Sequence, residues 1–149
     1  MLRTLTILLA LAAGPAVACQ NDMSVAREVV AATNNYRANL GRGALSLDSE
    51  LTRAALRHAC ELKTTGRFSH RGVNGSRVGD RASSAGYRWR YIAENIASGQ
   101  RSPYEVMVAW KNSAGHNRTL LNTNGQDIGV AAVRSGRSIM WVMVLGAPR

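Results

Sequence analysis

The chain has 149 residues, with 19 lysine and arginine against 9 acidic side chains, a formal net charge of +10. A composition of 46% hydrophobic and 19% charged residues is typical of one globular domain and excludes a disordered or fibrous chain. Two cysteines are too few for a disulfide-dense mini-protein or a four-cysteine zinc ribbon.

Residues 1–18 have the pattern of an export signal. Arg3 precedes the apolar run 5–13, and Ala16-Val17-Ala18 fits a small-x-small cleavage site. The apolar run is too short for a permanent transmembrane anchor, which needs about 20 residues. We therefore predict a signal peptide over 1–18, a mature domain over 19–149, a secreted or periplasmic location and no transmembrane span.

Cys19, the first residue after the predicted cleavage site, has two interpretations. In an oxidising compartment it would pair with Cys60 and stabilise the fold by roughly 4 kcal/mol in the chain-entropy model. The same position resembles a lipoprotein site, in which an acylated Cys19 would anchor the protein and leave Cys60 unpaired. The disulfide is favoured, because residue 16 is alanine where lipoprotein sites more often carry leucine.

The mature chain begins with helical patterns. Apolar residues at helical spacing predict a helix over Ser24–Leu40, and Asp48 is the expected N-cap of a second helix. Residues 67–79 are rich in glycine, serine, asparagine and arginine, which predicts a connecting or functional loop. A short helix is expected over 78–85 and a strand over 91–97.

A third long helix has the clearest start in the sequence. Ser102 is expected to cap it, Pro103 to occupy its first position, and Glu105 to close a capping box with Ser102. The helix is expected to end near residues 113–115.

The C-terminal part alternates apolar and polar residues. Segments 127–134 and 138–145 therefore predict a β-hairpin around residues 135–137. Three or four helices around a small antiparallel sheet indicate an α+β fold rather than a parallel βαβ array.

The chain has three histidines. His58 lies on the apolar face of the second predicted helix, which predicts a packed, hydrogen-bonded core residue. His70 and His116 follow small residues in loop-like sequence, where flexible backbone can aim an imidazole into a cleft. Their spacing matches no local metal motif, so a shared site and two ordinary surface or capping histidines both remain open.

Glu94 lies in an apolar, strand-like segment. A carboxylate there needs a partner, because an unpaired buried charge costs several kcal/mol. Arg81 would be a purely structural partner. Alternatively, Glu94 faces His70 and His116, where it would hydrogen-bond an imidazole or accept a proton from bound water.

A series of short motifs spans residues 25–145 in a specific order. They are Asn35-Tyr36-Arg37, Phe68-Ser69-His70, Gly86-Tyr87, Ala93-Glu94-Asn95-Ile96-Ala97, Trp110-Lys111-Asn112-Ser113 with Gly115-His116, and Ile128-Gly129-Val130 with Trp141-Val142. This order resembles the CAP superfamily, also called the SCP domain, in its compact bacterial form. The resemblance implies an α-β-α sandwich with a central antiparallel sheet and a shallow cleft.

Members of that superfamily often line the cleft with two histidines and two glutamates, and some bind zinc or another divalent cation there. His70, Glu94 and His116 match three of these four positions, with the two histidines as metal ligands and Glu94 as the catalytic candidate. Ser113, close to His116, joins them as a ligand-binding candidate. The fourth acid is missing from the segment 110–113.

Arginines concentrate in the middle third of the chain, around His70 and Glu94. They are Arg67, Arg71, Arg77, Arg81, Arg88, Arg90 and Arg101. Clustered arginines suit phosphate or carboxylate partners, and for an exported protein these would be anionic lipid, lipopolysaccharide or an envelope polymer rather than nucleic acid. A solvated basic face that only maintains solubility is the other interpretation.

Two functions from different classes follow. The first is an exported monomeric module that binds an anionic envelope component, lipid or small ligand, with or without a divalent metal. The alternative is a metal-dependent hydrolase that uses His70, His116 and Glu94. The fold does not select between them.

Overall fold

A computed structural model describes residues 19–149, and the predicted signal peptide (1–18) lies outside the described residues. Over 19–149, none of the helices combines the length and the apolar character that crossing a bilayer requires. The helices are α1 (Met23–Asn39), α2 (Ser49–Thr65), α3 (Val78–Ser84), α4 (Pro103–Lys111) and α5 (Ala114–Leu120). The strands are β1 (Ser46–Leu47), β2 (Trp89–Ser98), β3 (Asp127–Ser135) and β4 (Ser138–Pro148).

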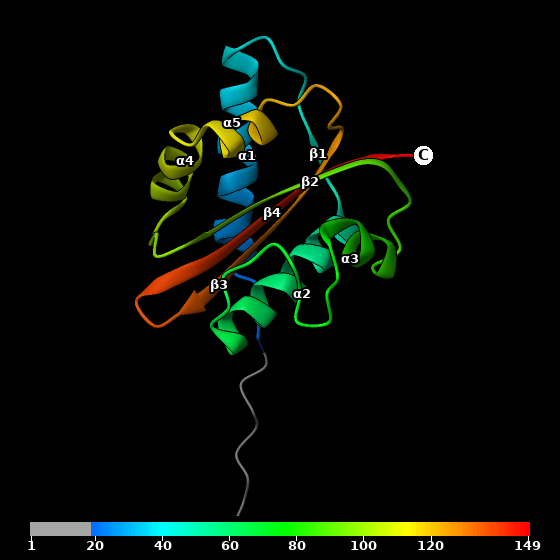
Figure 1. Cartoon of the computed structure of the whole chain (residues 1–149). Coiled ribbons are helices and arrows are strands. Elements are labelled where there is room, and N and C mark those ends of the chain that lie inside the picture. Colours follow the sequence, from blue (N-terminus) through cyan, green and yellow to red (C-terminus); the bar gives the residue numbers. More distant parts are fainter. Residues whose placement is uncertain (1–18) are drawn as a thin grey trace, which may run out of the picture.

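The strands form one sheet in the order β1-β3-β4-β2. The pairs β3–β4 and β4–β2 are antiparallel, as predicted, whereas the two-residue β1 adds to β3 in the parallel direction. Helices α1, α4 and α5 lie on one side of the sheet, and α2 and α3 lie on the other (Figure 1). The α+β class and the α-β-α sandwich are therefore confirmed.

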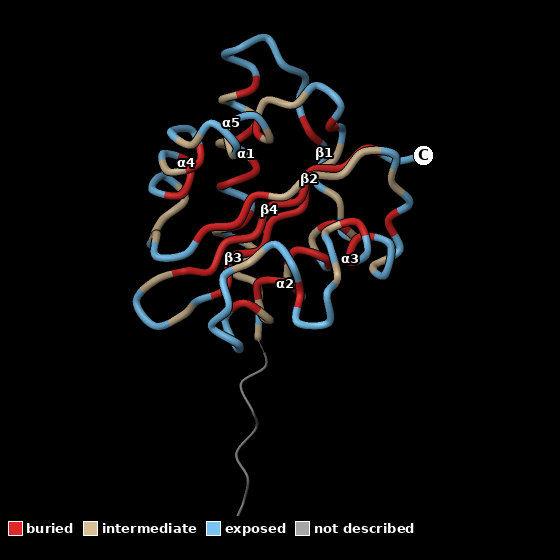
Figure 2. The backbone as a smooth tube through the Cα atoms, viewed as in Figure 1, coloured by how far each residue is buried: buried red, intermediate tan, exposed pale blue. Residues whose placement is uncertain are grey.

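Strand alternation divides the interior into two apolar clusters. On β3, Val130 and Ala132 face the cluster beneath α1 and α4, while Ala131 and Val133 face the cluster beneath α2. On β4, Trp141 faces the cluster beneath α1 and α4, while Met140 and Val142 face the cluster beneath α2. Successive side chains of a strand point to opposite faces, so one hairpin supplies both clusters. The buried positions form a continuous band along the sheet (Figure 2).

Two predicted helix starts are confirmed, one with a different detail. Asp48 Oδ1 accepts a hydrogen bond from the Leu51 amide at 2.8 Å and begins α2. Ser102 caps α4, but the carboxylate of Glu105 accepts from the amide of Arg101 at 2.8 Å instead of from Ser102. The predicted capping box is therefore wrong, because the Glu105 side chain binds the amide of Arg101, the residue before the cap, and not the amide of Ser102.

His116 does not lie in a loop. The chain breaks the helical pattern at residues 112–113 and starts again at once as α5, so that His116 is its third residue. Ser113 is the N-cap of α5, although its side chain makes no capping hydrogen bond. Gly115 suggests a stop in the sequence, but one glycine costs only about 1 kcal/mol in a helix and tertiary packing outweighs it.

The α2 helix packs directly against the backbone of β3. A Cβ atom on Gly129 would collide with the backbone of Leu51 and Thr52, so only glycine permits this close approach. The contact sets the depth at which α2 lies on the sheet. It thereby also positions the side chains that α2 sends towards the site described below.

A disulfide joins Cys19 to Cys60 on α2, with the two Cα atoms 5.9 Å apart. It ties the first described residue to the outer helical layer formed by α2 and α3. The predicted pairing is confirmed, and within residues 19–149 no cysteine is free. A sulfur in this bridge has no thiol to acylate, so the disulfide and the lipid anchor exclude each other at Cys19.

Candidate functional site

Glu94 on β2 is a buried carboxylate with two strong partners. Its side chain is only 2% exposed. Oε1 accepts a hydrogen bond from Nδ1 of His70 at 2.8 Å, and Oε2 accepts from Nη2 of Arg81 at 2.8 Å. Arg81 and an imidazole were expected from the sequence as alternative partners of Glu94, and the structure has both Arg81 and His70 bound to it. Arg81 neutralises the carboxylate, and Glu94 orients the His70 ring.

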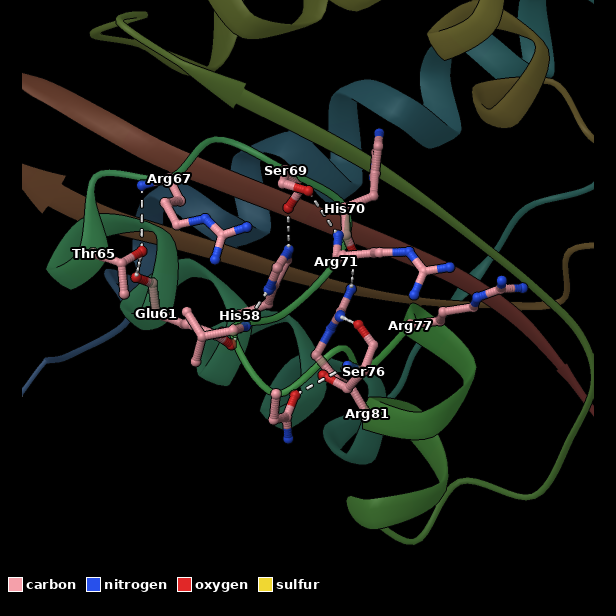
Figure 3. Close-up of polar contacts among 12 residues, drawn as sticks. His58, Glu61, Thr65, Arg67, Ser69, His70, Arg71, Ser76, Arg77 and Arg81 are labelled. Atoms are coloured by element: carbon pink, nitrogen blue, oxygen red, sulfur yellow. Dashed lines mark hydrogen bonds and ion pairs between the residues drawn. The ribbon is translucent and has the colours of Figure 1, made fainter.

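Arg81 also holds the backbone that carries His70. Its guanidinium donates to the carbonyl oxygen of Ser76 at 2.9 Å and to that of His70 at 3.1 Å (Figure 3). The Arg81 side chain is as buried as Glu94, at 2% exposure. One buried guanidinium therefore connects α3, the loop before it and β2.

Two residues of α2 secure the same loop from the other side. His58 is fully buried, and its Nε2 donates to the carbonyl oxygen of Ser69 at 2.9 Å (Figure 3). Glu61 accepts from the amide of Val73. The expectation of a packed, hydrogen-bonded His58 is met, and its contact with the loop beside His70 is additional.

The buried position of His58 gives an expected acid sensitivity. Burial lowers the pKa of His58, although Glu94 and Glu61 oppose this and Arg81 adds to it. Below the unfolded-state pKa of about 6.5, the unfolded chain gains a proton that the folded chain resists. The free energy of unfolding should therefore fall as the pH falls through this range.

Replacing the imidazole of His58 tests whether it contributes to this loss of stability at low pH. Urea unfolding across a pH series should show a shallower acid loss for His58→Gln than for the wild type, because glutamine does not titrate and can still donate to Ser69. The pKa of His116 is also lowered, but His116 is present in both proteins and cancels in the comparison. Equal slopes would assign the acid sensitivity to other groups.

His116 lies near His70 but does not complete a cluster with it. Burial, and then the neighbouring His70, lower the pKa of His116. The carbonyl oxygen of His116 accepts from the side-chain amide of Asn95 at 3.0 Å, which ties α5 to β2. The structure thus brings His70 and Glu94 into contact and leaves His116 within electrostatic range.

A cavity of about 450 Å³ opens beside His70. Its lining residues are His70, Arg71, Arg77, Val78 and Glu94. His116 and Ser113 are not among them. Within residues 19–149, neither Arg71 nor Arg77 forms an ion pair, whereas Glu94 is already paired with Arg81. The uncompensated charge at the cavity is therefore positive.

Comparison with known proteins decides the family. The model of the family described as "Cysteine-rich secretory protein family", CAP, matches residues 30–145. The chain belongs to the CAP family. The match covers both helical layers and most of the sheet.

Two Bacillus subtilis proteins are similar to most of this CAP domain. YkwD is 36% identical over 110 residues, which are 74% of this chain and 43% of YkwD. The membrane protein YlbC is 27% identical over 108 residues, which are 72% of this chain and 31% of YlbC. The chain thus spans less than half the length of these relatives.

Solved structures share the CAP fold. An outer surface protein of Borrelia burgdorferi superposes with a TM-score of 0.81 at 21% identity, covering 88% of this chain and 98% of that one. An extracellular SCP-domain protein of Bacillus anthracis gives 0.78 at 23% identity, covering 83% of this chain and 40% of that one. At these identities the likeness concerns the fold alone.

The residues present in this CAP domain do not fit a three-ligand zinc site. Among residues 19–149, no group of three or more histidine, cysteine, aspartate or glutamate side chains is placed to hold a metal. Each oxygen of Glu94 already accepts one hydrogen bond, from His70 and from Arg81. Catalytic zinc sites commonly use three protein ligands, and the described residues bring no third ligand together with the imidazoles of His70 and His116.

Sequence reasoning missed Glu61 entirely, and it assigned His58 to the core without its contact with the loop. Glu61 and His58 are one helical turn apart on α2, just before the arginine-rich loop, and both bind loop backbone. The available signal was a polar residue on an otherwise apolar helix face. Such a residue needs a partner when buried, but the helix alone does not show that the partner is a loop carbonyl.

Proposed function

We propose that this CAP domain is an exported binding module whose cavity takes an anionic group, a phosphate or a carboxylate. The supporting observation is the charge of the cavity: Arg71 and Arg77 line it without acidic partners, while Glu94 is neutralised by Arg81. A guanidinium binds phosphate and carboxylate through paired N–H groups, which suits both ligand classes.

The loop that carries these groups is held in place before any ligand binds. His58, Glu61 and Arg81 each bind its backbone. A preorganised site loses less conformational entropy on binding than a mobile one. Glu94 adds to this by fixing the His70 ring at the cavity wall.

Export is part of the same proposal. The disulfide between Cys19 and Cys60 is typical of an oxidising compartment. Structures with the same fold are described as an extracellular protein and an outer surface protein. Anionic lipid, lipopolysaccharide and acidic envelope polymers carry the groups that the cavity would take, and all occur outside the cytoplasm.

Nuclear magnetic resonance titration tests the anion site with two soluble probes, glycerol phosphate and glucuronate. We expect saturable shifts of amide signals in residues 67–78. Arg71→Ala with Arg77→Ala should weaken the affinity by at least about tenfold, because each charge-assisted hydrogen bond contributes about 1.5–3 kcal/mol. Arg137→Ala, which removes an exposed arginine at the β3–β4 turn, is the matched control. Equal affinity in all three proteins would refute the site.

The hydrolase alternative stays a prediction from the family resemblance. No observation in the cavity favours it over binding, because the Glu94 oxygens already accept two hydrogen bonds and no third metal donor accompanies His70 and His116. If zinc binds, His70→Ala with His116→Ala should abolish its uptake, as measured by equilibrium dialysis.

A further inference from the structure

The α2–α3 loop (residues 66–77) combines exposed apolar and basic side chains. Phe68 is 56% exposed and Val73 is 57% exposed, although most large apolar side chains of the described chain are buried. Phe68 is also the only phenylalanine in the sequence. The loop is exposed along most of its length (Figure 2). An exposed apolar surface of this kind often marks an interaction site.

The charge of this loop restricts the partner. It carries Arg67, Arg71 and Arg77 and contains no aspartate or glutamate. Arg67 and Arg77 lie on either side of His70 in the close-up, and Arg71 lies next to it (Figure 3). Basic groups next to exposed apolar side chains match an anionic membrane surface, where the headgroups attract arginine and the interface accepts apolar groups.

The fold holds the apolar side chains outward. The carbonyl oxygen of Ser69 accepts from His58, and the amide of Val73 donates to Glu61, so the residues beside Phe68 and Val73 itself are tied to α2. Within the loop, the Gly72 amide donates to the Ser76 carbonyl oxygen at 2.9 Å. Exposure of Phe68 and Val73 is therefore a feature of an ordered loop.

We propose that the α2–α3 loop docks on an anionic phospholipid bilayer, with Phe68 and Val73 entering the interface and Arg67 and Arg71 contacting headgroup phosphates. This goes beyond the anion cavity, because Phe68 and Val73 do not line it. Docking would place the cavity mouth beside the membrane, since His70 lies between the two apolar residues in the loop.

Vesicle co-sedimentation tests the docking surface. The probes are vesicles of phosphatidylcholine and vesicles in which about one third is phosphatidylglycerol. The wild-type protein should bind the anionic vesicles and release them as salt rises, because exposed charges are screened. Phe68→Ser with Val73→Ser should lower the partition coefficient by about tenfold, since both side chains lose their contact with the interface.

A matched variant removes similar apolar groups elsewhere. Tyr104 and Val108 on α4 are 78% and 36% exposed and lie in the opposite helical layer. Tyr104→Ser with Val108→Ser should leave vesicle binding unchanged. As a direct readout, nitroxide-labelled lipid should broaden the amide signals of residues 67–74 more than those of 104–108.

The outcomes separate this proposal from the anion cavity. Loss of vesicle binding in Phe68→Ser with Val73→Ser, while glycerol phosphate still binds, supports docking and also shows that the variant is folded. If the protein binds neither glycerol phosphate nor glucuronate but still binds vesicles through Phe68, docking stands and the anion cavity is refuted. Equal binding to neutral vesicles, an unchanged partition coefficient in the variant, or binding to lipopolysaccharide but not to phospholipid would overturn the docking proposal.

Discussion

Arg81→Met is expected to lower the free energy of unfolding by about 3–5 kcal/mol, because it leaves the carboxylate of Glu94 buried without its cationic partner. The change also removes the hydrogen bonds from Arg81 to the carbonyl oxygens of Ser76 and His70. Urea unfolding monitored by tryptophan fluorescence measures the loss.

A double-mutant cycle isolates the ion pair in that loss. Glu94→Met alone leaves a buried guanidinium unpaired, whereas Arg81→Met with Glu94→Met replaces both charges by apolar groups of similar length. The double variant should be more stable than either single variant, since an apolar pair has no desolvated charge. Additive losses in the two single variants would show that Arg81 acts through the loop carbonyls rather than through Glu94.

Removing the disulfide is expected to have a comparable effect. Cys19→Ala with Cys60→Ala should lower the free energy of unfolding by about 4 kcal/mol, because the bridge closes a loop across a sequence separation of 41. Thermal unfolding of the wild type with and without reductant, beside the double variant, measures this. Reductant should not change the melting temperature of the variant.

Mass spectrometry of the purified protein gives the covalent state of Cys19. A mass two protons below that of the reduced chain supports the bridge seen in the structure. Two acyl chains on Cys19 would contradict it, and would place the protein on a membrane through its N-terminus. In that case the stability difference between wild type and variant should disappear.

Local patterns predict most of the secondary structure. Asp48 begins α2, and segments 127–134 and 138–145 form the hairpin of β3 and β4. The expected alternation of apolar and polar residues does not hold in these strands, because helices cover both faces of the sheet and nearly every position is buried. These features depend on neighbours within a few positions, so that spacing and capping are sufficient to predict them. The separate helix α5 (Ala114–Leu120), which contains His116, was not predicted, because Gly115 suggests a stop and the burial of Leu120 against the core depends on tertiary packing.

The candidate site is only partly readable from the chain. The need of Glu94 for a partner follows from its apolar strand, and the expected alternatives were Arg81, or His70 together with His116. The structure has Arg81 and His70 at the same carboxylate, one on each oxygen, and shows no contact between His116 and Glu94. No residue pattern distinguishes one partner from two, because the carboxylate and its partners are separated along the chain.

Sequence alone is sufficient for the α+β class, the export pattern, the positive charge and the family resemblance. The tertiary structure decides which charges remain free. It pairs Glu94 with Arg81 and leaves Arg71 and Arg77 facing a cavity. The physical reason is that helices, strands and net charge arise from local or summed properties of the chain, whereas charge compensation depends on which side chains meet after α2, α3 and β2 have packed together.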